Sequence, residues 1–339
     1  MNKKNYTVGG LFSGIGGIEL GFQQAGGFDV LWGNEIDEKA AITYQQNFDH
    51  TLYVEDIHML NPTDLAPVEI LTGGFPCQAF SIAGYRKGFS DPRGNLFFEI
   101  VRLIEGMKEK PKALFLENVK NLTGHDKGNT AKVIKETLNS LGYSSFWKVL
   151  NTADYTEIPQ NRERTFIICF RDESIWNTFQ DPSSAACSGK FASLFPPEKP
   201  KVRKHISEML EKGKVDDKFY YKKAYFQEEL EDSVVSRDTM YQWRRKYVRE
   251  NKSDMCPTLT ANMGTGGHNV PIIKDDYGIR KLTPRECFNL QGFPESYVLP
   301  EIANSQLYKQ AGNAVTVAMV RKLAEAVGEA LNQKYGNQI

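Results

Sequence analysis

A glycine- and proline-rich run presents one cysteine as a possible nucleophile. Cys77 ends the run Gly73-Gly74-Phe75-Pro76-Cys77, and Gln78 follows it. The glycines and the proline predict a stiff turn that exposes the sulfur, directly after a strand expected at residues 69–72. The polar, basic residues 81–94 that follow are typical of a mobile active-site loop. Because a single cysteine is more often a small buried hydrophobe, the hypothesis depends on which groups lie beside it.

Ionisable residues flank two later apolar runs. Glu117 comes directly after one β-rich run, and Arg162 and Arg164 come just before another. In a doubly wound sheet, ligands bind at the carboxyl ends of the strands, so we expect Glu117 to face the same crevice as Cys77. If residues 160–165 are extended, the two arginines point the same way and add positive charge there. The alternative for the arginine pair is a salt-bridged strand edge.

A glycine-containing turn near the start of the chain is typical of a nucleotide-like cofactor site. The turn Phe12-Ser13-Gly14-Ile15-Gly16-Gly17 follows a predicted strand and opens a helix. It is not the dinucleotide fingerprint, because Glu19 stands where the third glycine would be. Glu35, after the second strand, is placed to accept hydrogen bonds from ribose hydroxyls, and Asp56, after the third, from an adenine amino group. Alone, the turn could be structural, and either acid could be a surface residue or a helix cap.

Six apolar runs alternate with helical patterns over the first 170 residues. This alternation predicts an α/β fold with a doubly wound, mostly parallel sheet covered by helices on both faces. Residues 96–104 place apolar side chains at helical spacing, and residues 314–331 predict a final helix that packs back on this domain. Beyond Arg171 the rhythm breaks, and residues 172–280 predict a second, loop-rich domain. The expected strands are residues 7–12, 29–32, 52–54, 69–72, 113–116 and 165–170.

Composition bounds the classes of function. The 339 residues contain 42 basic and 42 acidic side chains, so net charge alone does not indicate a nucleic-acid ligand. Five cysteines without close pairs argue against a disulfide framework and a zinc site, and we expect no metal. No apolar run approaches the roughly 20 residues of a membrane span, and no signal peptide is evident, which predicts a soluble cytoplasmic protein.

One basic stretch could still contact nucleic acid. Residues 237–249 combine five basic side chains with Tyr241, Trp243 and Tyr247. Phosphate contact with base stacking suits this mixture. The alternative is a solvated helix face whose aromatic side chains turn inward.

In their order, these motifs resemble the cytosine-5 DNA methyltransferases of bacterial restriction-modification systems. The resemblance runs from Leu11 to the C-terminal helix. One departure is Gly10, where the family usually has an aspartate, and this puts one cofactor-side hydrogen bond in doubt. The matching blocks are Leu11-Phe12-Ser13-Gly14-Ile15-Gly16-Gly17, Asn34-Glu35-Ile36-Asp37, Phe75-Pro76-Cys77-Gln78, Gly94-Asn95-Leu96-Phe97-Phe98-Glu99, Glu117-Asn118-Val119, Gln160-Asn161-Arg162-Glu163-Arg164, Arg280-Lys281-Leu282-Thr283-Pro284-Arg285-Glu286-Cys287, Gln291-Gly292-Phe293-Pro294 and Gln310-Ala311-Gly312-Asn313-Ala314-Val315.

The resemblance implies a mechanism and two domains. A thiolate at Cys77 adds to carbon 6 of a flipped cytosine, Glu117 assists at ring nitrogen 3, Arg164 contacts the base carbonyl, and carbon 5 is methylated from S-adenosylmethionine. Residues 1–175 with 305–339 would form the catalytic and cofactor-binding domain, and residues 176–304 a target-recognition domain. The catalytic residues implied are Cys77, Glu117, Arg162 and Arg164. The cofactor residues implied are Phe12, Gly14, Gly16, Glu35, Ile36, Asp56, Ile57, Pro76, Leu96, Asn313 and Val315. The DNA-binding residues implied are Gln78, Ser81, Arg93, Arg244, Arg245 and Thr258.

The family also implies partners. These are double-stranded DNA with a short specific site, bound by a monomer, and functional pairing with a restriction endonuclease. Three other hypotheses stay open at this point: a methyltransferase of structured RNA, a non-catalytic DNA-binding regulator, and a nicotinamide dehydrogenase. The variable region after Arg171 and the sequence Pro-Cys-Gln argue against a methyltransferase of structured RNA. The presence of Cys77, Glu117 and Arg164 together argues against a non-catalytic regulator. The broken glycine fingerprint argues against a dehydrogenase. For Phe12 and Leu96, the alternative is plain core packing.

Overall fold

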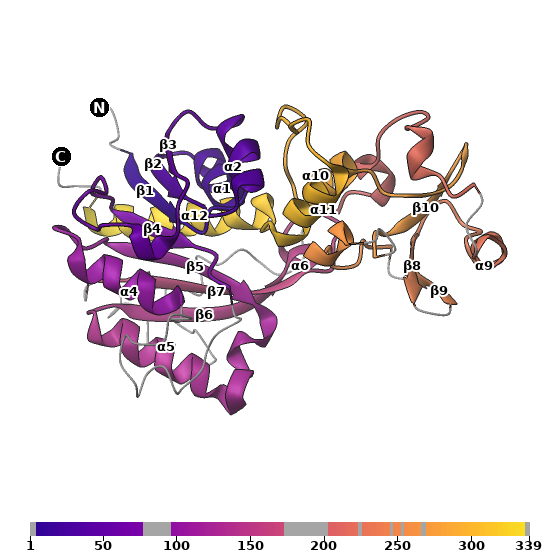
Figure 1. Ribbon diagram of the computed structural model, residues 1–339. Coiled ribbons are helices and arrows are strands. Elements are labelled where there is room, and N and C mark those ends of the chain that lie inside the picture. The colour runs from indigo at the N-terminus through magenta and orange to yellow at the C-terminus, as the bar shows by residue number, and fades with distance from the viewer. Residues whose placement is uncertain are drawn as a thin grey trace. The chain divides into compact units, whose positions relative to one another are not determined.

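A computed structural model of the chain describes residues 5–76, 96–172, 203–222, 226–244, 247–251, 254–265 and 269–335. The chain divides into two compact units (Figure 1). The first comprises residues 1–150, 163–196 and 320–339, and the second residues 151–162 and 197–319. The predicted functional domains, which divide the chain at residues 175 and 305, stay a prediction.

The first unit is built on a seven-stranded sheet with the order β3-β2-β1-β4-β5-β7-β6. The pairs from β3 to β5 are parallel, whereas β7 runs antiparallel to β5. This confirms the predicted mostly parallel α/β fold. The strands are β1 Tyr6–Leu11, β2 Phe28–Asn34, β3 Thr51–Tyr53, β4 Ile70–Gly73, β5 Ala113–Val119, β6 Ser144–Asn151 and β7 Glu163–Phe170.

Helices cover both faces of this sheet because its central strands are apolar on both sides. Helices α4 and α5 pack on one face, in a core that also contains Leu114 and Leu116 (Figure 1). On the other face Phe22 of α1 packs edge-on against Phe115, and Gly21 lets α12 approach α1 at Val320. The helical segments are α1 Gly17–Ala25, α2 Glu38–Gln45, α4 Leu96–Gly106, α5 Asn129–Ser140 and α12 Val317–Tyr335, of which residues 320–335 belong here, with the short η1 Ile57–Met59, η2 Lys120–Thr123 and η3 His125–Gly128.

The second unit contains a four-stranded antiparallel sheet with the order β11-β10-β8-β9. A small core of buried side chains, including Tyr241 and Ile272, supports it. Its strands are β8 Met240–Arg244, β9 Tyr247–Asn251, β10 Ile272–Asp275 and β11 Gly278–Lys281. Its helical segments are α6 Thr152–Tyr155, α9 Gln227–Ser233, α10 Pro284–Leu290, α11 Asn304–Asn313, η4 Ile206–Met209, η5 Asp217–Phe219 and η6 Ala261–Gly264.

The structure differs from the sequence-based expectations at three places. Strand β6 was not predicted, and β7 is antiparallel rather than parallel to its neighbour β5. The basic stretch at residues 237–249 contributes the strands β8 and β9, so the helix-face alternative for it is wrong. Within the described residues, no helix is both long enough and apolar enough to cross a membrane.

Candidate active site

The turn that leads toward Cys77 is anchored to strand β5. Strand β4 ends at Gly73, which pairs with Leu116 of β5. Two residues after Leu116, the buried Asn118 side chain donates a hydrogen bond of 2.8 Å to the Phe75 carbonyl oxygen. Phe75 is itself buried and packs its ring against Phe97 of α4. Packing and a buried hydrogen bond therefore fix the start of this turn.

The same turn passes beside Glu117. A Cβ atom added at Gly74 would lie 3.5 Å from Oε2 of Glu117. Pro76 is exposed, and Cys77, the next residue, lies outside the described residues. The structure thus brings the segment immediately before the predicted nucleophile to the predicted carboxylate.

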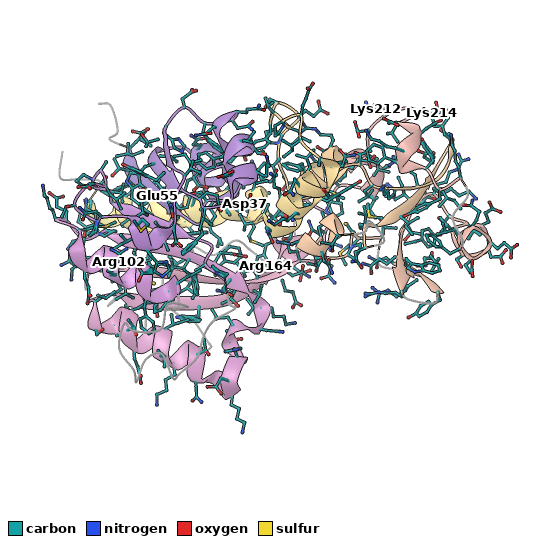
Figure 2. All side chains as sticks on the ribbon, viewed as in Figure 1. Asp37, Glu55, Arg102, Arg164, Lys212 and Lys214 are labelled. Carbon is teal, nitrogen blue, oxygen red and sulfur yellow. The ribbon has the colours of Figure 1, made fainter. Side chains whose placement is uncertain are left out.

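Glu117 forms an ion pair at this edge of the sheet with Arg164, which is labelled in Figure 2. Nε of Arg164 lies 3.1 Å from Oε1 of Glu117, and the two side chains are only 17% and 15% exposed. Antiparallel pairing of β5 with β7 brings them together, because Arg164 lies opposite Val119, two residues beyond Glu117. Burial lowers the pKa of Arg164, and the charge of Glu117 opposes this shift. The pair places a guanidinium charge in a poorly solvated site, where its field is weakly screened.

Arg162 has different partners from Arg164. It belongs to the second unit, where it is 1% exposed. Its guanidinium donates to the carbonyl oxygens of Leu259, Gly312 and Ala314 over 2.7, 3.1 and 2.6 Å. The predicted convergence of the two arginines is therefore not seen, and these hydrogen bonds favour a structural role for Arg162.

The glycine-containing turn has the backbone geometry that its sequence predicts. Phe12, Gly14 and Gly16 all have positive φ, at 55°, 57° and 80°. Gly16 must also lack a side chain, because a Cβ atom there would lie 2.1 Å from the Phe48 ring. At Gly14 an added Cβ would have no atom of the described residues within 4 Å, so the turn is open there toward the described part of the chain. Such a turn exposes backbone to a ligand that approaches closely.

Glu35 holds this turn in place. Its two carboxylate oxygens accept hydrogen bonds of 2.7 Å from the backbone N–H groups of Gly14 and Asp37. Asp37 in turn caps helix α2 by accepting from the backbone N–H groups of Lys39 and Ala40. The predicted ribose-binding carboxylate is therefore oriented by backbone hydrogen bonds at the end of β2.

Asp56 and its neighbours form the next segment along this edge. The Asp56 carboxylate accepts from the backbone N–H and the ring Nδ1 of His58, over 3.0 and 2.6 Å. The backbone hydrogen bond from His58 lowers the pKa of Asp56, which keeps an acceptor available there. Ile36 is 61% exposed, whereas Ile57 is buried. An exposed isoleucine is unusual for a core residue and suits contact with a flat ligand.

The sequence analysis did not single out Arg102, which supports this segment. It extends from α4 and donates to the carbonyl oxygens of Ile57 and Leu60 over 2.9 and 3.0 Å (Figure 2). Its Nε pairs with Glu99 one helical turn earlier at 2.6 Å. The signal was the spacing of these two opposite charges on a mostly apolar helix. Leu96, at the start of α4, is partly buried against the core, as is Phe12.

A buried carboxyl fills the place next to Gly10. A Cβ atom at Gly10 would lie 2.1 Å from Oε1 of Glu19 and 2.8 Å from the Ser13 hydroxyl oxygen. Within the described residues, neither Glu19 oxygen nor the Ser13 hydroxyl has a hydrogen-bond partner. Burial raises the pKa of Glu19 to about 7, against a smaller lowering by the nearby Ser13 hydroxyl. The resemblance predicts an acid at position 10. This chain has a glycine there, and the carboxyl group of Glu19 occupies the space beside it.

The remaining predicted residues belong to the second unit or lie outside the described residues. Asn313, at the end of α11, is exposed, and Val315 is 7% exposed. Arg244 is exposed on β8, whereas Thr258 donates a hydrogen bond of 2.5 Å to the Asn161 carbonyl oxygen, which favours a structural role. The predicted DNA-binding residues outside the described part of the chain are Gln78, Ser81, Arg93 and Arg245.

Three other cysteines are poor nucleophiles. Cys169, Cys256 and Cys287 are completely buried, and burial raises the pKa of each thiol. A thiol held in its neutral form reacts slowly, because the thiolate is the nucleophile.

Solved structures with the same architecture are methyltransferases. The chain matches the Dnmt2 methyltransferase of Schizosaccharomyces pombe with a TM-score of 0.69 at 18% identity, covering 97% of this chain and 99% of that one. It also matches a putative DNA modification methyltransferase encoded within a prophage of Escherichia coli, with a TM-score of 0.66 at 22% identity, over 97% of this chain and 100% of that one. At such identities the likeness shows the fold alone, and the fold is that of a methyltransferase.

Sequence relatives define the family. A model of the C-5 cytosine-specific DNA methylases matches residues 6–329. The type II methyltransferase M.Bsp6I of Bacillus sp. is 52% identical over 94% of this chain and 98% of the relative. M.HhaI of Haemophilus parahaemolyticus is 36% identical over 96% of this chain and 94% of the relative. The chain belongs to the C-5 cytosine-specific DNA methylase family, and it is a DNA (cytosine-5-)-methyltransferase of the type II modification class.

Proposed function

We propose that this enzyme methylates carbon 5 of one cytosine within a short specific site of double-stranded DNA, with S-adenosylmethionine as the methyl donor. The observation that carries the proposal is the partly buried Glu117–Arg164 ion pair beside Gly74, which lies three residues before Cys77. A carboxyl group, a guanidinium and a cysteine-bearing turn at one sheet edge suit covalent activation of an electron-poor ring.

Cys77 acts as the nucleophile. Its thiolate forms a bond to carbon 6 of the cytosine ring, and the electron pair displaced from the ring double bond makes carbon 5 nucleophilic. Glu117, in its protonated form, donates a proton or a strong hydrogen bond to ring nitrogen 3, which makes this addition easier. Once carbon 5 is methylated, it loses its proton, the bond from sulfur to carbon 6 breaks, and the thiolate and the aromatic ring are restored.

Arg164 has two roles. Its guanidinium contacts the base carbonyl oxygen, and its positive charge favours the thiolate form of Cys77. The burial of the ion pair supports both roles, because a charge acts more strongly where water is scarce. Arg162, which bonds three backbone carbonyl groups, holds the second unit together instead.

The residues around the glycine-containing turn fit the proposed cofactor. S-adenosylmethionine supplies an electrophilic methyl group on a positively charged sulfur. Phe12, Gly14 and Gly16 would line its methionine and adenine parts, Glu35 its ribose, and Asp56, Ile36 and Ile57 its adenine. Pro76, Leu96, Asn313 and Val315 complete the proposed set. Three observations among the described residues support this fit: Ile36 is exposed, an added Cβ at Gly14 would meet no atom within 4 Å, and the buried oxygens of Glu19 and Ser13 have no hydrogen-bond partner.

The target cytosine must leave the double helix to be methylated. A stacked base cannot reach a thiolate and a carboxyl group at a sheet edge, so the enzyme flips it out, at a cost of a few kcal/mol. Residues 1–175 with 305–339 provide catalysis, and residues 176–304 select the DNA sequence. We infer that the protein acts as a monomer in the bacterial cytoplasm and protects DNA from a cognate restriction endonuclease.

One assay tests the proposal. The purified enzyme is incubated with duplex DNA and S-adenosylmethionine labelled in its methyl group, and the product is read by bisulfite sequencing. We expect methylated cytosines at one short sequence, no methylation by Cys77→Ser, and full methylation by Cys187→Ser, which changes a cysteine outside the matched motifs. Full activity of a folded Cys77→Ser variant would contradict the mechanism. Methylation of structured RNA in preference to duplex DNA would contradict the substrate.

A further inference from the structure

The hairpin of β8 and β9 has one apolar and one polar face. Tyr241 is fully buried, and Trp243, two residues on, stacks against Phe226 with ring centroids 4.5 Å apart. These side chains fix one face of the hairpin on the core of the second unit. Because side chains alternate along a strand, Gln242 and Arg244 point to the other face.

On that polar face, the strand register brings a group of hydrogen-bond donors together. Gln242 lies opposite Arg249, and Arg244 lies opposite Tyr247. Directly opposite residues of an antiparallel pair share a face, so all four side chains lie on the same side. Arg244, Tyr247 and Arg249 are exposed, Tyr247 by 58%.

The two arginines determine the orientation of Gln242. Nη2 of Arg249 lies 2.6 Å from Oε1 of Gln242, and Nη2 of Arg244 lies 3.2 Å from the same oxygen. A guanidinium can only donate, so the group that faces both arginines must be the amide oxygen. Both lone pairs of the Gln242 amide oxygen are then occupied, and the amide NH2 group remains available as a donor. With this arrangement Gln242, Arg244 and Arg249 all offer donors.

The charges of this face are available to a ligand. Among the residues that the structure describes, neither Arg244 nor Arg249 is paired with a carboxylate; their bonds to Gln242 are the contacts that orient them. β8 pairs with β10 through Tyr241, and β9 is the edge strand of the sheet. The rest of the hairpin is thus a two-stranded ribbon, an element that fits the major groove of DNA.

We propose that this face of the β8–β9 hairpin, formed by Gln242, Arg244 and Arg249, reads guanine in the major groove of the target site. The inference rests on the proposed function, because it assigns a base to the DNA that the enzyme methylates. Guanine is the base whose major-groove edge offers two neighbouring acceptors, N7 and O6, which match the donor fork of an arginine.

The same geometry disfavours two other bases. Glutamine reads adenine by accepting from N6 and donating to N7, which requires the amide oxygen that the arginines occupy. The major-groove edge of cytosine offers an amino donor and needs an acceptor, which Gln242, Arg244 and Arg249 do not offer in this arrangement. Phosphate oxygens also accept hydrogen bonds, and the experiment separates them from guanine.

The test measures sequence preference rather than activity alone. A library of duplex DNA with randomised sequence is methylated and read by bisulfite sequencing, for the wild type, Arg249→Ala, Arg249→Lys and the control Lys218→Ala. Lys218 is an exposed cation of the same unit, paired with Asp216, so its removal matches the change in charge. We expect Arg249→Ala to lose about 5- to 150-fold of the preference for guanine at one position of the site. Arg249→Lys should lose this preference too, while it keeps the charge for phosphate.

Each outcome decides between the possibilities. An unchanged guanine preference in both Arg249 variants overturns the inference. A uniform loss of methylation at all sequences, with a shallower dependence on salt, indicates phosphate contact and also overturns it. If Arg249→Ala fails to fold by circular dichroism, the more conservative Arg249→Lys carries the test. A wild type that methylates no DNA contradicts the proposed function itself, which is a different result from methylation with unaltered preference.

Discussion

Buried charged groups occur in both units, but their hydrogen-bonding capacity is used to different degrees. In the second unit, Arg280 is 1% exposed and bonds both oxygens of Glu286 over 2.8 and 2.7 Å, and Asp275 over 2.6 Å. Glu286 also accepts from the backbone N–H groups of Thr283 and Glu211. Although burial lowers the pKa of Arg280, these carboxylates raise it overall, so the arginine stays charged.

In the first unit, a buried carboxyl beside β1 is bonded less completely. The oxygens of Glu19 have no hydrogen-bond partner among the described residues, whereas Arg164 pairs with Glu117 and donates to the Glu163 carbonyl oxygen. Incompletely satisfied buried groups cost stability, and they persist where a ligand or a reaction uses them. We infer that the Arg280 network stabilises the fold, and we propose that the residues at the sheet edge serve the reaction.

The largest expected effect is on activity, at Glu117. Glu117→Gln keeps the size of the side chain but removes the proton donor, and we expect methylation to fall by about 10²- to 10⁴-fold. Cofactor affinity, measured by calorimetry with S-adenosylhomocysteine, should change little because Glu117 faces the proposed base site. If the variant instead unfolds with no specific loss of turnover, Glu117 has a structural role like that of the Arg280 network, and the contrast between the two units is wrong.

A second prediction concerns the stability of the second unit. Arg280→Met removes the cation and leaves Glu286 and Asp275 buried without it, which should lower the free energy of unfolding by about 3–5 kcal/mol near neutral pH. Urea unfolding measures this difference. A decrease of less than about 1 kcal/mol would show that water replaces the arginine, and that the network is not a stabilising one.

A third prediction concerns the pH dependence of stability at Glu19. Its pKa in the folded protein is about 7, above the ordinary value of 4.5, so folding favours the protonated form. The contribution of Glu19 to stability should therefore be largest below about pH 4.5, and about 3 kcal/mol of it should be lost as the pH rises to above 7. Glu19→Gln cannot ionise, so relative to the wild type it should be stabilised at pH 8 and nearly unchanged at pH 4.5. Equal unfolding free energies of the two proteins at pH 8 would rule out a buried, ionising Glu19.

The smallest effect is expected at a neighbouring surface pair. Lys120 and Glu163 lie 2.7 Å apart but are 54% and 42% exposed. Lys120→Ala should change the free energy of unfolding by less than about 1 kcal/mol and leave turnover unaltered. If Lys120→Ala lowers the free energy of unfolding as much as Arg280→Met does, solvent exposure does not distinguish charged residues that matter for function or stability from those that matter for neither.

The strands of the first unit were largely predictable from the sequence. Strands that are buried on both faces read as short apolar runs, and five such runs correspond to β1, β2, β4, β5 and β7, while the run at residues 52–54 corresponds to the partly exposed edge strand β3. Strand β6 was missed because Trp147, Lys148 and Val149 in its middle are only partly buried, as befits an edge strand. The antiparallel direction of β7 was not predictable, since an apolar run has the same composition in either direction.

The site was predictable in part. The acids and glycines of the cofactor turn lie where strand ends place them, and Glu117 does meet the turn before Cys77. The different partners of Arg162 and Arg164 were not predictable, because both follow the same alternating pattern in sequence. The pairing of Gln242 with two arginines was equally hidden, since it depends on the register between β8 and β9.

By itself the sequence determined the order of the elements, the family and the types of residue available for chemistry, because apolar periodicity and local motifs are properties of neighbouring residues. The tertiary structure decided which of those residues meet. In it, Glu117 pairs with Arg164, Arg162 donates hydrogen bonds to backbone carbonyl groups, and the Glu19 carboxyl lies in the space beside Gly10. These contacts join residues far apart in the chain or on separate elements, and so they depend on strand direction, register and packing.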